Sequence, residues 1–473
     1  MGHRSRRQWA FAARGLLVLV AVLLLPLAAM VQPPGESKAE SATQDTLWAG
    51  QGFVLEVCAD PSSPAALASC FGSPLGTQGV NVRALATDGV NVYFAGRDGG
   101  LSCPIADLGE NCTRIMAGPW PTGYNCNNRG QYCSTNEVTA LAAGDGYLWF
   151  AQKSNDIYRC PVNLPYTQQS SAPGACVKLD DGGGHDIQAL VLANGTLYAG
   201  LRSQGDGVVA SKEARVWKCD PNRKDACSDL DKLGNDSVES LAVGGGYVWA
   251  GTIEGTILRC DPARTNSCTQ WEDAGNRKAV DALSYDGAGL LYSGVGGYTS
   301  GTDSKGVVWS CLAASANRCS DVLHDKDGTS VAAGAGSVFS TANDDQYFAT
   351  SRFTAGRIPS AKLLYIPAAG PIGVGAASVS VRSAPDAPLT GKGCTQQGKN
   401  PKAILTVQGP NAFSMTKSID ACGLRDGAAS SRSFQLLDPG DYTVTVRSGT
   451  YSGQAAFTVE SDKITRVAVE IAR

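Results

Sequence analysis

Short apolar runs separated by glycine-rich turns recur along most of this chain. The clearest copy starts at Val238 as Val-Glu-Ser-Leu-Ala-Val, passes through Gly244-Gly245-Gly246 and continues as Tyr-Val-Trp-Ala-Gly. Glycine supplies the positive φ angles that tight hairpin turns need. The runs are apolar at successive positions, which is typical of strands that are covered on both faces. The pattern therefore predicts many short strands joined by tight turns, and so an all-β fold.

Three features recur between residues 46 and 370: a V-x-A-L-A-like strand, an apolar strand with an aromatic residue, and a strand that ends in cysteine. The aromatic residues are on average 48.5 residues apart, and they are Trp48, Tyr93, Trp149, Tyr198, Trp249, Tyr292 and Phe339. A period of about 40–50 residues is typical of propeller blades, because one copy is too small to bury its own apolar strands. Seven aromatic positions favour a seven-bladed β-propeller, and six blades are the alternative if the partial copies at the two ends merge.

The two ends of this repeat region are incomplete copies. Residues 46–72 supply the second, third and fourth strands of a blade without the first. Residues 330–367 supply a first and a second strand, with Lys362-Leu-Leu-Tyr-Ile-Pro as the expected third. A closed ring has to hide its strand edges, so we expect the two ends to exchange strands.

All sixteen cysteines follow residue 31 and fall into couples that are close in sequence. These couples are Cys58/Cys70, Cys103/Cys112, Cys126/Cys133, Cys160/Cys176, Cys219/Cys227, Cys260/Cys268, Cys311/Cys319 and Cys394/Cys422. An even count in an exported chain indicates disulfides. Zinc sites would need C-x-x-C pairs or interleaved histidines, and the chain has only His3, His185 and His324. We therefore predict eight disulfides, most of them closing outer hairpins of blades, and no metal site.

The N-terminus has the layout of an export signal. Four arginines precede an apolar run from Gly15 to Val31, so residues 1–31 are predicted to form a hydrophobic leader helix, as a cleaved signal peptide or an uncleaved transmembrane anchor. Residues 32–45 read as a flexible linker. After the leader the chain has 36 basic and 43 acidic residues, so nucleic acid is not expected as a partner. We expect an extracytoplasmic protein, secreted or anchored at the cell surface through its N-terminal segment.

Residues 374–473 follow a different pattern. Polar and apolar residues alternate in strands such as Ser378-Val-Ser-Val and Tyr442-Thr-Val-Thr-Val. About 100 residues with roughly seven short strands suit an Ig-like or transthyretin-like β-sandwich. Such modules usually act as spacers or contact surfaces.

Two segments carry a resemblance to known repeats. Val248-Trp-Ala-Gly-Thr-Ile-Glu-Gly and Val92-Tyr-Phe-Ala-Gly-Arg-Asp-Gly-Gly resemble two-component-regulator-type propellers of the WD40/YVTN-like superfamily, and the C-D-P…C hairpins are similar to those of cysteine-bearing surface propellers in it. Leu437-Asp-Pro-Gly-Asp-Tyr-Thr-Val-Thr-Val resembles the strand pair of PEGA and carboxypeptidase-regulatory-like sandwiches. The resemblance implies architecture only, because such propellers serve as sensors, adhesins and enzymes alike.

The positions of long insertions between the predicted strands indicate which face of the ring binds a ligand. In an up-and-down blade, insertions at 120–136, 203–215, 296–305 and 342–361 lie on one face of the ring, and only that at 161–175 lies on the other. Binding loops concentrate where a rigid scaffold tolerates insertions, although drift in unconstrained loops is the alternative. We call this side the insertion-bearing face and predict that it binds a protein or glycan ligand. The candidate ligand-binding residues are Trp120, Tyr124, Tyr298, Tyr347 and Arg352.

Catalytic motifs are missing from the sequence, which has no G-x-S-x-G, H-E-x-x-H or P-loop. A propeller lyase or hydrolase of polysaccharide could use His185 with the acids Asp181, Asp186, Asp344 and Asp345. The simpler interpretation of the segment around His185 is a solvated glycine loop, and a segment from His324 to Gly328 lacks the later ligands of a calcium loop. We predict a binding protein without catalytic residues or cofactor, with a purely structural surface component as a further alternative.

Overall fold

The chain is built from strands and turns. The computed structural model describes residues 45–51, 54–59, 61, 75–76, 82–96, 99–108, 111–117, 138–152, 156–162, 176–182, 185–202, 213–234, 236–273, 279–296, 307–316, 318–324, 330–334, 337–341, 348–350, 362–366, 374–384, 402–410, 413–421, 424, 429–461 and 463–472. These residues contain no α-helix, which confirms the all-β prediction, and so no helix among them could span a bilayer. Residues 41–473 form one compact unit. The predicted leader (1–31) and nearly all of the predicted linker lie outside the described residues.

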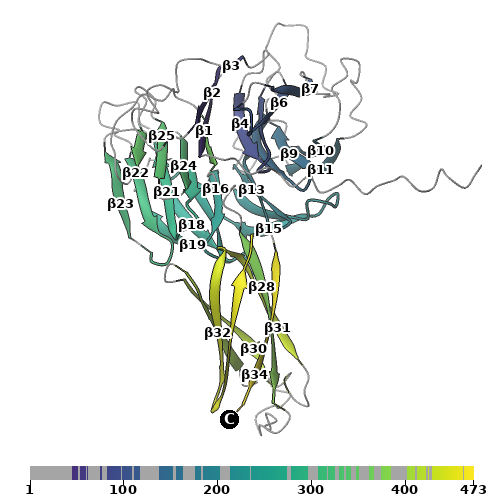
Figure 1. The fold of residues 1–473 in the computed structure, drawn as a ribbon, viewed down its shortest axis with the longest axis vertical. Helices are drawn as coiled ribbons and strands as arrows, with labels where there is room; N and C mark the ends of the chain where they lie inside the picture. Colours follow the sequence, from purple (N-terminus) through teal and green to yellow (C-terminus); the bar gives the residue numbers. More distant parts are fainter. Residues whose placement is uncertain are drawn as a thin grey trace, which may run out of the picture. The chain divides into compact units, whose positions relative to one another are not determined.

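The repeat region forms small antiparallel sheets in which each strand pairs with the next along the chain (Figure 1). The first sheet wholly formed by consecutive strands contains β4 (Val82–Thr87), β5 (Asn91–Gly96), β6 (Gly99–Pro104) and β7 (Thr113–Ala117). The following sheets contain β8 (Val138–Gly144), β9 (Tyr147–Gln152), β10 (Ile157–Pro161) and β11 (Val177–Asp180); β12 (Ile187–Ala193), β13 (Thr196–Leu201), β14 (Arg215–Cys219) and β15 (Cys227–Lys232); β16 (Val238–Gly244), β17 (Tyr247–Thr252), β18 (Thr256–Cys260) and β19 (Thr269–Asp273); and β20 (Val280–Tyr285), β21 (Leu290–Val295), β22 (Val307–Leu312) and β23 (Cys319–His324).

The two ends of the repeat region contribute to the remaining sheets. One contains β24 (Ser330–Gly334), β25 (Ser337–Thr341) and β26 (Phe348–Thr350), and the other has the order β27 (Lys362–Ile366), β1 (Thr46–Gln51), β2 (Val54–Ala59) and β3 (Leu75–Gly76). The first strands β4, β8, β12, β16, β20 and β24, here called the inner strands, contact one another in succession. Strand β27 contacts both β24 and β4, so the series of inner strands returns to its start. These four-stranded antiparallel sheets resemble propeller blades.

The strand at Lys362–Ile366 confirms that the two ends exchange a strand, but it corrects the role that we expected for this segment. We expected it as the third strand of the copy that starts near residue 330, but β26 is that strand. Instead, β27 pairs antiparallel with β1, with Trp48 opposite Leu364 and Thr46 opposite Ile366. The physical reason is that the N-terminal copy has no first strand of its own, so the edge of β1 would otherwise be open. The fourth strand of this sheet, β3, also lies beyond the expected limit at residue 72.

The second strands of the sheets form the core. Strands β5, β9, β13, β17 and β21 share one pattern, a half-buried first residue followed by five buried ones. Their aromatic residues are almost fully buried, and Trp149 and Trp249 have no exposed surface. The prediction that these strands are covered on both faces is therefore confirmed.

The predicted cysteine-closed hairpins are confirmed at five positions. The disulfides are Cys103–Cys112, Cys160–Cys176, Cys219–Cys227, Cys260–Cys268 and Cys311–Cys319. Cys58 is also disulfide-bonded. The other predicted disulfide cysteines, Cys70, Cys126, Cys133, Cys394 and Cys422, lie outside the described residues.

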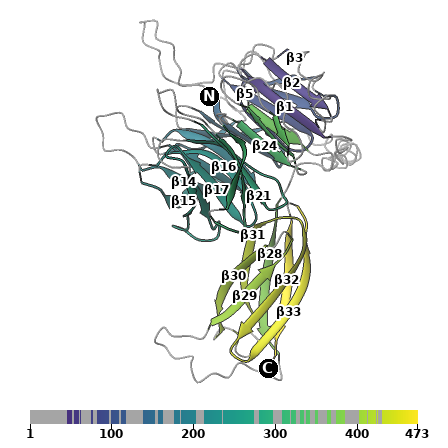
Figure 2. The ribbon, with the colours of Figure 1, turned by 90° about the vertical axis from the view of Figure 1, so that its left-hand side faces the viewer.

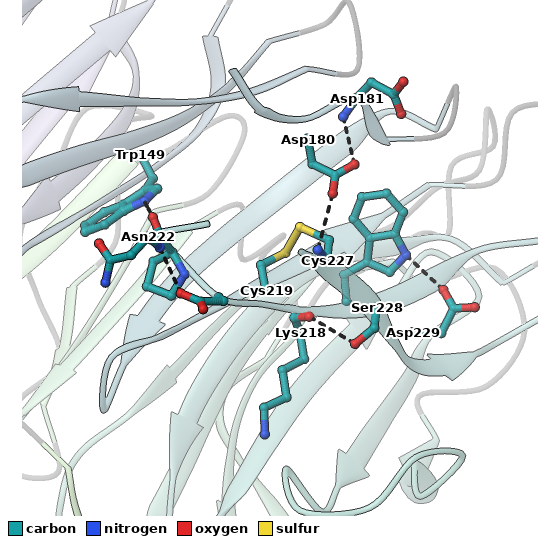
Figure 3. Close-up of a disulfide and its surroundings, with 12 residues drawn as sticks. Trp149, Asp180, Asp181, Lys218, Cys219, Asn222, Cys227, Ser228 and Asp229 are labelled. Carbon is teal, nitrogen blue, oxygen red and sulfur yellow. Dashed lines mark hydrogen bonds between the residues drawn. A yellow bond between two sulfur atoms is a disulfide. The ribbon is translucent and has the colours of Figure 1, made fainter. Parts of the chain in front are cut away.

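Two of these hairpins are also tied to the sheet before them. Figure 3 shows Asp180, at the end of β11, whose carboxylate accepts a hydrogen bond of 3.3 Å from the backbone N–H of Cys227 in the next sheet. The next pair of sheets repeats the contact, because the carboxylate of Asp231 accepts from the N–H of Cys268 at 2.6 Å. The disulfide and the aspartate together hold the outer strands, which have the fewest neighbours.

Residues 375–471 form two further sheets, here called the C-terminal sheets (Figure 2). One has the order β31 (Ser430–Leu437), β28 (Gly375–Ser383) and β34 (Ile464–Ile471), with β28 and β34 parallel. The other has the order β30 (Ser414–Asp420), β29 (Lys402–Gln408), β32 (Gly440–Ser448) and β33 (Tyr451–Val459). Alternate residues of both sheets, such as Val379, Leu405 and Val444, are fully buried in one shared core.

Candidate recognition face

The predicted ligand-binding residues do not fall on described parts of the chain. Trp120, Tyr124, Tyr298, Tyr347 and Arg352 all lie outside them. The structure does describe the strand ends from which their segments leave. Connections β7–β8, β13–β14, β21–β22 and β25–β26 carry the predicted insertions, although the fourth is shorter than predicted because β26 divides it. By strand order, all four connections join the end of the sheets at which the inner strands begin.

The inner strands share a β-bulge at this end. In five consecutive sheets the pairing register shifts just after the first residue of the inner strand. The bulged residues, here called the rim residues, are Arg83, Thr139, Gln188, Glu239 and Asp281. Bulges redirect side chains and are frequent beside binding sites. Each rim residue is the polar second residue of a mainly apolar strand, so the polar x of the V-x-A-L-A pattern was the sequence signal for this feature.

Polar contacts link neighbouring sheets around the rim. The hydroxyl of Thr139 donates a hydrogen bond of 2.6 Å to the carbonyl of Ile187 on the next inner strand. Ser240, beside the rim residue Glu239, donates to the carbonyl of Val280 on the following one at 2.8 Å. These bonds fix the inner-strand ends relative to one another. A binding surface built on them is therefore rigid before a ligand arrives, which lowers the entropic cost of binding.

The rim carries both signs of charge. Arg83 is exposed, whereas Glu239 and Asp281 are half-buried on neighbouring inner strands. The guanidinium Nε of Arg202, which follows β13, lies 3.2 Å from a carboxylate oxygen of Glu239. A mixed surface of this kind does not suit a polyanion, and it fits a ligand that offers both hydrogen-bond donors and acceptors.

The segment between β11 and β12 differs from the expected solvated loop. His185 is buried, with 4% of its surface exposed, and its backbone N–H donates to the carbonyl of Gly182 at 3.1 Å. Asp181 is exposed and Asp186 is half-buried, whereas Asp344 and Asp345 lie outside the described residues.

The described residues contain no group of three or more His, Cys, Asp or Glu side chains that could hold a metal ion. The segment after His324, the hypothetical calcium loop, lies outside them. The described part of this face offers polar and charged contacts.

Comparisons with known proteins add the following. No family model and no curated protein sequence matches the chain. Among solved structures, one protein in a nidogen/laminin complex is similar, with 12% identity and a TM-score of 0.40 over 59% of this chain and 92% of that one. The extracellular domain of a hybrid two-component system of B. thetaiotaomicron has 15% identity and a TM-score of 0.40, over 68% of this chain and 39% of that one. The WD40 β-propeller domain of Doa1 has 13% identity and a TM-score of 0.41, over 59% and 82% of the two chains.

These similarities concern the fold, and they transfer no ligand or activity to this chain. The cellular environment follows from the disulfides instead. Five described disulfides indicate an oxidising compartment, so the protein is extracytoplasmic.

Proposed function

We propose that the chain is an extracytoplasmic binding protein that recognises a protein or glycan through the insertion-bearing face of a seven-bladed β-propeller. In this proposal the C-terminal sheets form an Ig-like or transthyretin-like β-sandwich. The inner strands with β27 supply seven blades, and the closed series of their contacts supports this count. The rim residues give the propeller a polar, rigid centre on that face.

The observation that carries the proposal is the position of the contacts to the C-terminal sheets. The N–H of Gly246, in the turn between β16 and β17, donates to the carbonyl of Leu436 at 2.6 Å. The side chain of Asn194, in the turn between β12 and β13, donates to the carbonyl of Gly375 at 2.8 Å. These turns join first to second strands, so they lie at the opposite end of the inner strands from the rim. These two contacts lie away from the insertion-bearing face, which supports its availability to a partner.

Screening the exported chain on glycan and protein arrays tests this function. We expect a ligand of one of the two classes, and the array decides which. Trp120→Ala combined with Tyr124→Ala should weaken binding at least tenfold, because aromatic anchors carry most of the energy of such interfaces. Arg83→Ala should weaken it through the rim itself.

Tyr166→Ala is the matched control, because its insertion (161–175) belongs to the other face. Unchanged affinity in both the aromatic and the Arg83 variants, or an equal loss in the Tyr166 variant, would move the binding site away from the insertion-bearing face. A complete lack of ligands together with tight retention in the cell envelope would instead favour a structural component.

Anchoring is a separate part of the proposal. We propose that residues 1–31 direct export and either are removed or stay as the membrane anchor, with residues 32–45 as a linker. N-terminal sequencing of the mature protein decides this: a start near residue 30 means secretion, and an intact leader in the membrane fraction means an anchored ectodomain.

A further inference from the structure

One of the C-terminal sheets carries an open groove on its outer face. The groove has a volume of about 780 Å³, and its lining residues belong to β29, β32 and β33 or directly follow β29. These three strands pair side by side (Figure 2). Ligand sites in proteins have volumes of about 300–1,000 Å³, so this groove can hold a ligand of several linked units.

The alternation of the strands explains the shape of the groove. Along β32 and β33, residues point in turn to the core and to the outer face. Ala456 pairs with Thr443, and Thr443 pairs with Gln408, so the three form one row across the outer face. Thr445 and Gln454 pair with each other in the next row. Because Ala456 has the shortest side chain in these rows, it leaves a depression between longer neighbours.

Polar side chains in the groove are available to a ligand. Four of them make no hydrogen bond to another described residue, namely Gln408, Thr443, Thr445 and Gln454. The half of the sheet beside β30 differs, because the hydroxyls of Thr406 and Thr416 bond to each other at 3.2 Å. An amide or a hydroxyl can both donate and accept, so the groove presents both kinds of group to a ligand.

Charge narrows the class of ligand. Among the described residues that line the groove only Asp441 is charged, and its carboxylate already accepts a hydrogen bond of 2.7 Å from the hydroxyl of Thr458. A ligand with carboxylate, sulfate or phosphate groups would therefore meet no cationic partner among them. Sugar hydroxyls donate and accept as the groove residues do, and the half-buried ring of Phe457 offers an apolar contact for the C–H groups of a sugar.

We propose that this groove binds a neutral polysaccharide, that is, a chain of sugars without charged groups. The amides of Gln408 and Gln454 donate to and accept from the hydroxyls of the chain, together with the neighbouring threonines. A sugar ring occupies the space above Ala456. The site is separate from the insertion-bearing face, because all of its described residues belong to the C-terminal sheets.

Affinity electrophoresis of the exported protein in native gels tests the proposal. The gels contain laminarin, xyloglucan or dextran as neutral polysaccharides, and polygalacturonate as the charged probe. We expect at least one neutral polysaccharide to retard the protein. Ala456→Trp fills the groove and should abolish this retardation, whereas it should not change the mobility of the protein in polygalacturonate.

Two further variants separate binding from folding. Ala468→Trp is the matched control, because Ala468 is also an exposed alanine but lies in β34 of the other C-terminal sheet. It adds the same ring outside the groove and should leave the retardation unchanged. Gln408→Ala combined with Gln454→Ala removes two exposed amides and should weaken binding about tenfold. This double variant decides if Ala456→Trp lowers the thermal unfolding temperature.

Several results would overturn the proposal. They are no retardation by any of the three neutral polysaccharides, full retardation in a folded Ala456→Trp protein, full affinity in the double glutamine variant, or an equal loss in the Ala468→Trp protein. A loss in the Trp120→Ala and Tyr124→Ala protein, with full retardation in the Ala456→Trp protein, would assign the polysaccharide to the insertion-bearing face instead. That result would support the proposed function, so the two proposals can fail separately.

Discussion

Asp438 is one of the polar residues that connect the C-terminal sheets to the repeat region. It is 4% exposed, and its carboxylate accepts a hydrogen bond of 2.6 Å from the hydroxyl of Tyr285 and one of 3.2 Å from the N–H of Gly245. Its own carbonyl accepts from the hydroxyl of Tyr442 at 2.9 Å. Burial raises the pKa of Asp438 to about 6, although the two donors to its carboxylate oppose this rise. Two neutral donors therefore compensate only part of the cost of removing the charge from water.

The raised pKa of Asp438 predicts how the free energy of unfolding changes with pH. In the unfolded chain the carboxyl has its ordinary pKa of 3.8, so the folded chain binds the proton more tightly. The contribution of this group to stability is therefore greatest below pH 4, falls as the pH rises to about 6, and is constant above it. The total fall is about 2–3 kcal/mol. Asp438→Asn cannot ionise, so its stability should lack this part of the pH dependence.

Urea unfolding of both proteins between pH 4 and pH 8 measures the effect. Other carboxylates titrate in both proteins and cancel when the two curves are subtracted. A difference curve that is flat across this range would show that Asp438 keeps its ordinary pKa.

Gly244 gives a second prediction at the residue scale. It has a φ of +150°, and a Cβ at this position would lie 2.0 Å from a ring carbon of Tyr285. Gly146, in the corresponding turn of another sheet, has a φ of +75° and open space around it. Gly146→Ala should therefore cost only the backbone strain of about 1 kcal/mol, whereas Gly244→Ala should cost about 2–4 kcal/mol because Tyr285 has to move off Asp438. Equal costs in chemical denaturation would mean that the ring of Tyr285 relaxes freely.

The cysteine-closed hairpin is the element that the sequence predicted best. Cys219 and Cys227 are eight residues apart and are direct register partners on β14 and β15, so local spacing was enough to pair them. The hydrogen bond from Cys227 to Asp180 could not be predicted in the same way, because it joins residues 47 positions apart in two sheets. A local pattern reports the contacts within a hairpin, whereas contacts between sheets depend on how the copies stack.

Removal of one disulfide tests this element. Replacing Cys219 and Cys227 together by serine should destabilise the chain by about 2–3 kcal/mol, because the unfolded chain gains freedom. Hydrogen exchange should become faster in β14–β15 and then in β11, which Asp180 connects to the hairpin. The β18–β19 hairpin keeps its own disulfide, Cys260–Cys268, and serves as the internal control. Faster exchange spread evenly over all sheets would indicate that the hairpins do not loosen separately.

At the scale of the whole molecule, the sequence predicted the sheets better than their closure. The period of the aromatic residues and the turns around Asn194 and Gly246 follow from local physics, so the sheets could be predicted. The partner of Lys362–Ile366 could not, because an apolar segment of five residues pairs equally well with any open edge of suitable length. The closing partner, β1, lies more than 300 residues earlier in the chain. The order of the strands along the chain was enough to predict which connections share the candidate recognition face. The β-bulge that defines the rim could not be predicted, because it shows only in the register between paired strands.

The pairing of β27 with β1, which joins the two ends of the repeat region, leads to the last prediction. Leu364 packs against the core cluster of Trp48 and is the register partner of that tryptophan. Leu364→Asp would bring a carboxylate into this contact, which should cost at least about 3 kcal/mol. Hydrogen exchange should then become faster in β1 and β2, while β24 and β25 stay protected, and the conservative Leu364→Ile should change neither. If protection were lost in β24 and β25 instead, the segment would belong to the sheet that precedes it in the chain, and the ends of the repeat region would not be joined by an exchanged strand.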